Sequence, residues 1–512
     1  MSETIVRGKW VVRGVRNRHQ AEIVEDGAVH QREGTIVAVG SYDSIRRAHP
    51  QLPVQGSPEH MILPGFVNAH HHVGLTPLQM GSPDYPLEQW LASRMARRDI
   101  DLYLDTLYSA FEMIASGITT VQHIHGWLRG PLENIQRGAR QVLDAYRAIG
   151  MRVSYSFAVR EQNRLVHEAD ADFVRRLPPE LGAAVGEHLS ALAIPFEDYL
   201  RLFDDLLRES RGESLTRIQL SPANLHWCSD AALVALNERA QSAGVPLHIH
   251  LVETAYQKEY ARRRTGTTAL KHLHRLGLLG PRLTLGHGVW LTEEDIELAA
   301  DTGTCICHNC SSNLRLRSGV APLNAFEARG MAVAMGLDEA GINDDRDMLQ
   351  EMRMVLRLHR VPGMDDGVPT CPQVLRMATE HGAATTPFGS MIGRLDPGRL
   401  CDLVLVNWRT ATWPYQDEDV PALDAVLQRA KTAAVDVVVV GGETIYENGR
   451  FTRVDRDAVL REIAAALGRP RSPAEERRRS MAKAVLPHVT EFYRAYLSEE
   501  TGEPFYRPSA RR

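Results

Sequence analysis

Apolar runs that end in polar residues recur through the middle of the chain, between about residues 59 and 390. Each run is long enough for a buried β-strand, and amphipathic helical patterns such as 230–243 and 293–300 separate them. The runs lie at 62–72, 117–123, 151–160, 217–224, 245–251, 282–288, 304–308 and 331–338. Eight alternating strand and helix units predict the α/β class and a (β/α)8 TIM barrel, whose reactive residues lie at the C-terminal ends of the strands.

The two ends of the chain have a different pattern, with short strands and tight turns near 10–12, 21–24 and 35–39, and again near 402–406 and 435–446. Two β-rich ends around a different middle predict that the termini pair into one small domain. We therefore expect a composite β-sandwich domain of residues 1–58 and 392–455, a barrel domain of residues 59–391, and a C-terminal helical tail of residues 456–512.

Two connections and the tail add to this plan. The segments 74–105 and 161–210 are longer than a barrel helix requires, which makes them candidate lids or substrate walls. In the tail, Ser472, Pro473 and Glu475 combine an N-cap, a first-turn proline and a capping-box acid. The apolar stripe that follows predicts a helix packed on the barrel, with a dimer contact as the alternative.

Composition is that of an ordinary soluble enzyme: the 512 residues are 44% hydrophobic and 24% charged, with a net charge of -5. The arginines are scattered among acids, so we expect no nucleic-acid partner. The N-terminus has no signal-peptide core and no window approaches a membrane span, which predicts a cytoplasmic protein without a membrane partner. Six cysteines are too few for a disulfide framework in a chain of this length and predict reduced thiols.

Candidate chemistry begins at the first barrel strand. If 66–72 is a strand, His70 and His72 point to one face and His71 to the other. Two imidazoles on one face at a strand end can bind one metal ion, so the remaining ligands are expected at other strand ends.

Three further strand ends carry suitable side chains. The fifth supplies His250, with Glu253 three residues on; the sixth ends at His287 and the eighth at Asp338. Three neutral imidazoles and a carboxylate suit zinc or ferrous iron. A metal held in this way lowers the pKa of a bound water toward neutrality and makes hydroxide available as a nucleophile.

Five segments follow one another along the chain in this order: PGFVNAHHH, HIHLVET, GHGVWL, CHNCSSNLRLRSGVAPL and AMGLDEA. Together they resemble the amidohydrolase superfamily, specifically its cytosine/guanine/adenosine-type deaminase and triazine-hydrolase (chlorohydrolase-like) branch. The resemblance covers about residues 1–460 and implies four metal ligands: His70, His72, His250 and Asp338.

The same resemblance implies the catalytic roles. Asp338 would also take a proton from the water, Glu253 would protonate a ring nitrogen, and His287 would orient the hydroxide or polarise the attacked centre. Binuclear relatives place a carbamylated lysine at strand four, and no lysine lies there. We therefore expect one divalent metal, zinc first, with iron, manganese or cobalt as alternatives.

The predicted function is hydrolytic deamination, in which hydroxyl replaces the amine of a small nitrogen heterocycle. Hydrolysis of a C–N bond in an acyclic urea, carbamate or amide is the alternative, and a lyase or isomerase lacks a supporting residue. A catalytically silent scaffold is disfavoured, because a scaffold has no need to keep all six site residues together. We expect a homo-oligomer, a dimer or tetramer, with a small-molecule substrate.

Substrate contacts are less clear from the sequence. The candidates are Gln79, His123, Arg160, His226 and His308. Ala223 stands where thioadenosine-type deaminases carry a substrate-contacting histidine, which makes a nucleoside less expected, and Glu339 adds an acid beside Asp338.

One cysteine-rich segment remains. Cys310 replaces the proline of the family's HNPxSN segment. A structural zinc at Cys305, Cys307 and Cys310 is disfavoured, because no second Cys/His pair follows.

Overall fold

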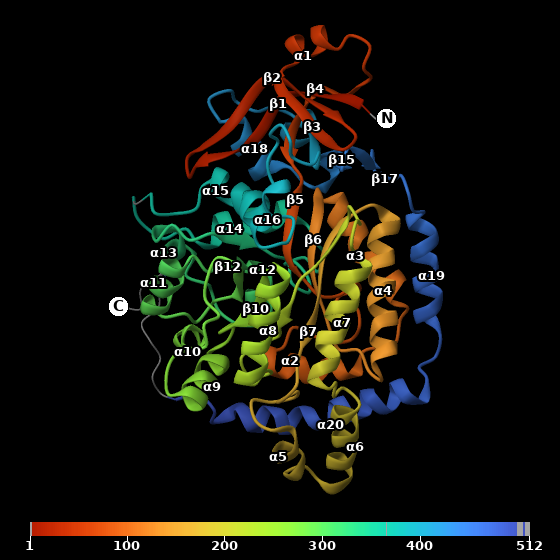
Figure 1. The fold of residues 1–512 in the computed structure, drawn as a ribbon, viewed down its shortest axis with the longest axis vertical. Helices are drawn as coiled ribbons and strands as arrows, with labels where there is room; N and C mark the ends of the chain where they lie inside the picture. The colour runs from red at the N-terminus through yellow and green to blue at the C-terminus, as the bar shows by residue number, and fades with distance from the viewer. Residues whose placement is uncertain (1–2, 365, 499–504, 507–512) are drawn as a thin grey trace.

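The computed structural model describes residues 3–364, 366–498 and 505–506 (Figure 1). Within this part of the chain, eight strands form a parallel barrel: β5 (Phe66–His71), β6 (Ile118–His125), β7 (Arg152–Val159), β8 (Thr216–Ile218), β10 (Leu247–Leu251), β11 (Leu283–His287), β12 (Cys305–His308) and β13 (Val333–Met335). They form two ladders, β5-β6-β7-β8 and β10-β11-β12-β13. Parallel bridges from Leu220 to Leu247 and from His71 to Asp338 close the ring. The predicted (β/α)8 barrel is confirmed.

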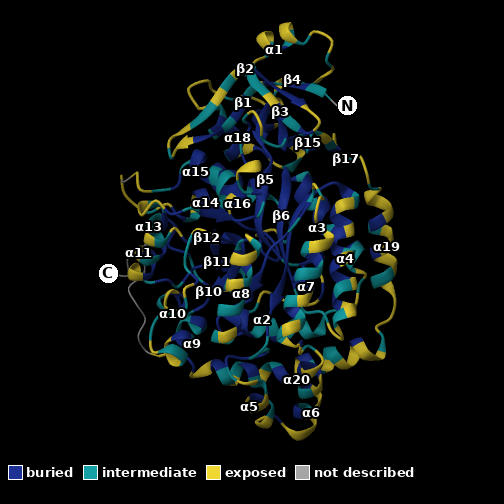
Figure 2. Ribbon diagram, viewed as in Figure 1, coloured by how far each residue is buried: buried dark blue, intermediate teal, exposed yellow. Residues whose placement is uncertain are grey.

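Helices surround these strands. They are α3 (Leu102–Ala115), α4 (Leu132–Ile149), α8 (Asp230–Ala243), α9 (Ala255–Thr265), α10 (Ala269–Arg275), α11 (Glu293–Thr302), α12 (Cys310–Arg315), α13 (Leu323–Ala328), α14 (Met348–Leu358) and α15 (Cys371–Arg376). The fourth strand is broken into two pieces: β8 ends at Ile218, and the chain pairs with β7 again at β9 (Ser221–Pro222). Figure 2 shows the barrel strands largely buried, inside helices that carry both buried and exposed residues.

Both ends of the chain contribute to one sheet. Among the described residues its strand order is β17-β16-β15-β14-β4-β1-β2-β3. The N-terminal strands are β1 (Glu3–Asn17), β2 (Gln20–Arg32), β3 (Thr35–Ser41) and β4 (Val54–Pro64); the C-terminal strands are β14 (Leu403–Asn407), β15 (Val435–Val440), β16 (Glu443–Glu447) and β17 (Arg450–Phe451). Antiparallel pairing of β4 with β14 joins the two ends, so the expected composite β structure is confirmed as one sheet. The domain boundaries stay a prediction.

The sheet and the barrel are held together tightly at two places. β4 ends at Pro64, and Gly65 turns the chain directly into β5; a Cβ at Gly65 would lie 2.3 Å from the Thr119 hydroxyl. At the base of β7, Arg152 forms a buried ion pair with Asp402, with Nε–Oδ2 at 2.6 Å and Nη2–Oδ1 at 3.0 Å. These contacts fix the orientation of β5, which carries the first two histidines of the site.

The long connections contain helices. Segment 74–105 holds α2 (Leu87–Ser93) and the short 3-10 helix η1 (Arg94–Ala96), and segment 161–210 holds α5 (Asp170–Arg175), α6 (Pro179–Ser190) and α7 (Phe196–Glu209). The expected wall at 161–210 was too wide, because α7 buries Leu202 and Leu206 in the main core as a barrel helix. The insert proper therefore ends near residue 195.

After α19 (Arg456–Gly468), the tail forms α20 (Pro473–Arg494), which begins with the predicted capping box of Ser472 and Glu475. It runs across the lower end of the barrel, as drawn in Figure 1, beside α2 and α6. Val485 and Val489 are buried against the inserts, in a cluster that includes Leu165 and Leu189. Among the described helices, none is both long and apolar enough to cross a bilayer.

Candidate active site

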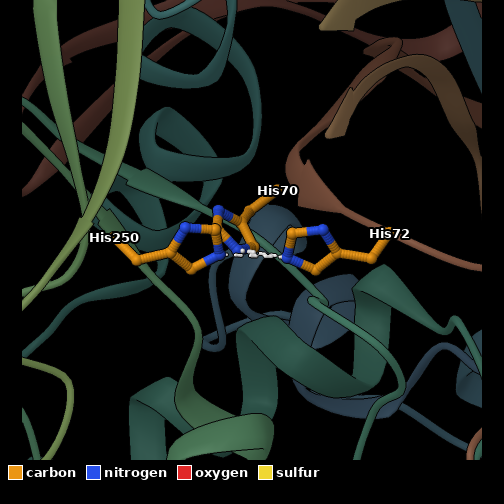
Figure 3. A group of neighbouring side chains, drawn as sticks. All are labelled: His70, His72 and His250. Atoms are coloured by element: carbon orange, nitrogen blue, oxygen red, sulfur yellow. Dashed lines mark hydrogen bonds between the residues drawn. The ribbon is translucent and has the colours of Figure 1, made fainter. Parts of the chain in front are cut away.

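Three histidines from two strands converge at the C-terminal end of the barrel (Figure 3). The Nε2 atom of His72 lies 3.0 Å from that of His70 and 3.1 Å from that of His250. His71 points the other way, toward the Asp338 carbonyl and the Ser109 hydroxyl, as strand alternation requires. The pair on β5 and the single histidine on β10 thus face one common point.

The hydrogen bonds behind the rings determine which nitrogens carry protons. His72 Nδ1 lies 2.6 Å from the Ile124 carbonyl oxygen, and His250 Nδ1 lies 2.7 Å from that of Ala223. A carbonyl can only accept, so both Nδ1 atoms donate. Burial lowers the pKa of both rings below the usual imidazole range and keeps them neutral. Their Nε2 lone pairs therefore face each other without a proton between them.

Such an arrangement repels unless a cation lies between the lone pairs. Nitrogens about 3 Å apart can all lie near the zinc–imidazole distance of about 2.0–2.1 Å from one ion. His70 completes the set, with its Nδ1 held 2.8 Å from His248 Nε2. The chemistry of the donor set therefore fits a divalent metal.

Asp338 follows β13 with a φ of 53°, in the left-handed region that Asp tolerates better than most residues. This conformation directs its carboxylate toward the histidines: Oδ1 lies 3.3 Å from His72 Nε2 and 3.7 Å from His70 Nε2. The Ser312 hydroxyl donates to Oδ2 at 2.6 Å. One carboxylate oxygen thus faces His70 and His72 while the other is held by Ser312.

Glu253 and His287 lie close to Asp338 in the same site. His287 Nε2 is 3.7 Å from Glu253 Oε2 and 3.8 Å from Asp338 Oδ2, and its Nδ1 lies 2.9 Å from Asn313 Oδ1. Burial raises the pKa of Glu253 to about 7, and the charge of Asp338 adds to this effect while His287 opposes it. A carboxyl group with this pKa holds a proton near neutral pH and can donate it.

The site opens into a cavity of about 660 Å³ that is lined by His72, His250, Glu253, His287 and Asp338 together with residues of the inserts. Arg160 lies in its wall between the rings of Trp127 and Trp227, at 4.4 and 4.6 Å from the ring centroids. No described residue forms an ion pair with the Arg160 guanidinium. Glu339 also lines the cavity and pairs with Arg94 of η1.

The other predicted substrate contacts lie in different surroundings. His123 lines the cavity, but its ring nitrogens already contact the Tyr146 hydroxyl and the His72 carbonyl oxygen. Gln79 is exposed and hydrogen-bonded to the Tyr108 hydroxyl. Gln79, His226 and His308 are not among the residues that line the cavity. His226 is buried 4.4 Å from the His167 ring, and His308 Nε2 lies 2.8 Å from His359 Nε2.

Sequence reasoning missed the residues that hold the site from behind. Ser312 and Asn313 fix Asp338 and His287, and the SSN triplet that follows Cys310 was the available signal. The carbonyl groups of Ile124 and Ala223, which set the histidine tautomers, have no sequence signal at all. All six cysteines fall within the described residues and are free, as expected.

Comparison with known proteins matches residues 61–445 to the amidohydrolase family. The chain belongs to this family. A 5-methylthioadenosine/S-adenosylhomocysteine deaminase of Syntrophobacter fumaroxidans is 31% identical over 447 residues, which cover 86% of this chain and 92% of that protein. A protein of the same name from Pyrococcus furiosus is 27% identical and covers 86% of this chain and 93% of its own length.

Solved structures agree in fold. An adenosine deaminase from Xanthomonas campestris with bound zinc has a TM-score of 0.75 and 24% identity, and covers 94% of this chain and 99% of its own. An atrazine chlorohydrolase from Arthrobacter aurescens complexed with zinc has a TM-score of 0.76 and 20% identity, and the match covers 90% of this chain and 99% of that protein's chain. The predicted family, the fold and the enzyme class, a hydrolase of C–N bonds, are thereby confirmed.

Proposed function

We propose that this protein is a mononuclear metal-dependent aminohydrolase that replaces an exocyclic amine with hydroxyl on a nitrogen heterocycle. The ligands are His70, His72, His250 and Asp338, and zinc is the preferred ion. The observation that carries the proposal is the convergence of three histidine Nε2 atoms, 3.0 and 3.1 Å apart, beside the Asp338 carboxylate, with the Nε2 atoms of His72 and His250 unprotonated.

A divalent metal in this position supplies Lewis acidity and lowers the pKa of water toward neutrality. The protein's own groups handle the protons. Asp338 accepts a proton from the attacking water, and its Oδ2 stays hydrogen-bonded to Ser312. Glu253 donates its proton to the ring nitrogen next to the attacked carbon, because that nitrogen gains electron density when the oxygen adds to the carbon. The proton that Asp338 has taken from the water then passes to the amine, which leaves as ammonia while the ring C–N double bond forms again.

His287 lies between the two carboxylates, and the Asn313 side chain fixes its ring through Nδ1. From this position it orients the attacking oxygen toward the ring carbon. Two carboxyl groups with different surroundings thus take the base and acid roles separately. Buried walls around the site keep other water from competing.

The relatives named as deaminases of thioadenosine compounds support a purine-like ring as the first class to test. Arg160, held between two tryptophans, is proposed to bind a carbonyl or anionic group of the substrate. Ala223 is buried, and its backbone carbonyl accepts from His250 Nδ1. Because this residue is alanine, the chain has no counterpart there of the histidine expected in thioadenosine-type enzymes.

Hydrolysis of an acyclic C–N bond remains the alternative, with Glu253 protonating the departing amine. We also keep as proposals the assembly into a dimer or tetramer, the location in the cytoplasm, and the lack of nucleic-acid and membrane partners. These follow from composition and general frequency, not from a feature of the site.

The deciding experiment is mass spectrometry of products from a mixed panel of aminopurines, aminopyrimidines, aminotriazines, ureas and amides. Metal-loaded protein is compared with chelator-treated protein and with Asp338→Asn. A metal-dependent exchange of amine for hydroxyl on an intact ring supports deamination. Two fragments from an acyclic compound would replace it with the alternative, and no metal-dependent product from any compound would overturn both.

A further inference from the structure

The cavity is larger than a single ring needs. Its volume of about 660 Å³ falls in the range of about 300–1,000 Å³ that is typical of sites for drug-sized ligands. From the histidines it extends to an end formed by the loop after β6 and by α4, α6 and α20. The lining there includes Arg98, Asp99, Asp101, Arg129, Arg137, His188 and Arg478. Four arginines and two aspartates give this end a positive balance.

Arg129 and His188 contact each other at this end of the cavity. Arg129 Nη2 lies 2.8 Å from His188 Nδ1 and 3.4 Å from His188 Nε2. A guanidinium only donates, so Nδ1 accepts and the proton of the neutral ring lies on Nε2. Burial, with added repulsion from Arg129 and Arg478, lowers the pKa of His188 to about 4 and keeps it neutral. His188 is only 8% exposed, and no described carboxylate forms an ion pair with Arg129.

Arg478 reaches the same end from α20. Its side chain is 14% exposed and bonds to Asp99 Oδ1 at 2.7 Å and to the Arg97 carbonyl at 3.2 Å. Asp101, the other nearby acid, is used as the N-cap of α3. Burial and the charge of Arg478 lower the pKa of Arg129, while Asp99 opposes this. Two guanidinium groups with one carboxylate between them leave positive charge for an anion to neutralise.

We propose that Arg129, His188 and Arg478 form a second subsite that binds an oxyanion, carboxylate or phosphate, at the end of the substrate remote from the reacting ring. The proposal rests on the proposed function and deepens it: the substrate is a heterocycle with an anionic tail. α20 lies beyond residues 61–445, the part of the chain that matches the amidohydrolase family, so Arg478 comes from a segment outside the family match, whereas Arg129 and His188 lie within it.

The first test needs no substrate. Inorganic phosphate is titrated into metal-loaded protein and the melting temperature is followed for wild type, Arg129→Gln, Arg478→Gln and the control Arg477→Gln. Arg477 precedes Arg478 on α20 and is exposed. We expect phosphate to raise the melting temperature of wild type and of the control, and the rise to be lost in the other two variants. No rise in wild type, or equal rises in all four, would overturn the subsite.

The second test identifies the anion. Each pair shares a ring and differs in its tail: 5′-methylthioadenosine against S-adenosylhomocysteine for carboxylate, and adenosine against its 5′-monophosphate for phosphate. Loss of a hydrogen bond to a charged group predicts that Arg478→Gln lowers the preference in kcat/KM for the anionic member by about 10- to 100-fold, mainly through KM. Arg478→Lys should restore part of it, which a role in folding alone would not explain.

An unchanged preference in Arg478→Gln would overturn the proposal for that tail. If wild type converts none of the four compounds, the proposed deamination fails for this ring class, while the phosphate titration still decides whether the subsite exists.

Discussion

Replacement of Ser312 tests how the protein holds its proposed base. The Ser312 hydroxyl donates to Asp338 Oδ2 at 2.6 Å, and both residues are buried. In Ser312→Ala that oxygen loses its hydrogen-bond donor, and His287 Nε2, at 3.8 Å, is too far away to replace it. A hydrogen bond to a charged group is worth about 1.5–3 kcal/mol. If that energy fixes the carboxylate for catalysis, kcat/KM should fall by about 10- to 100-fold, or about 1.4–2.8 kcal/mol.

The neighbouring serine provides a matched control. Ser311 uses its backbone N–H, at 2.9 Å, and its hydroxyl to hold the buried Glu351, which lies away from the metal ligands. Ser311→Ala should lower the free energy of unfolding by about 1–3 kcal/mol and leave kcat/KM of the folded enzyme near wild type. Initial rates and urea unfolding, measured with equal metal content, separate the two effects. Rates within threefold of wild type for Ser312→Ala, or equal losses in both variants, would refute the reasoning.

Three further predictions follow from the site and the fold. Asp338→Asn and Glu253→Gln should each slow turnover by at least about 10²–10⁴-fold with unchanged circular dichroism, because each loses a proton-transfer group; wild-type rates in either would rule out its role. Because protonated Glu253 is the donor and burial raises its pKa to about 7, kcat/KM should fall as pH rises through about 7, a limb that the residual activity of Glu253→Gln should lack. Arg152→Met leaves Asp402 buried and unpaired, and should lower the free energy of unfolding, measured in urea, by about 3–5 kcal/mol. The double variant Arg152→Met with Asp402→Leu should recover most of that loss. Equal stability of the single and double variants would contradict the pairing.

That His70 and His72 point to the same side of the strand could be predicted, because their relation is local. The period of two along a strand places His70 and His72 on one face and His71 on the other, whatever the rest of the chain does. The capping box of α20 is local in the same way, since Ser472 and Glu475 bond each other's backbone groups within one turn. Alternating strand and helix patterns then suffice for the barrel, because connections of this kind produce parallel strands.

The path of the long inserts could not be predicted from local sequence patterns. The segment 161–210 was expected to be one wall, yet α7 at its end belongs to the barrel. Gln79, His226 and His308 were predicted as substrate contacts, His308 from its match to the family's HNPxSN segment and His226 as a replacement for the histidine missing at Ala223. The structure places all three outside the lining of the cavity. The composition of a loop does not reveal its direction, which depends on what it packs against.

Periodicity and motifs within single segments were enough to predict the barrel, the family and the order of the proposed metal ligands along the chain. Only the tertiary structure decided which carbonyl groups set the histidine tautomers, which serine holds Asp338, and that α20 brings Arg478 to the same cavity as Arg129. The physical reason is distance along the chain. Arg129 and Arg478 meet through the packing of α20 on the inserts, and no local pattern encodes the direction in which those surfaces come together.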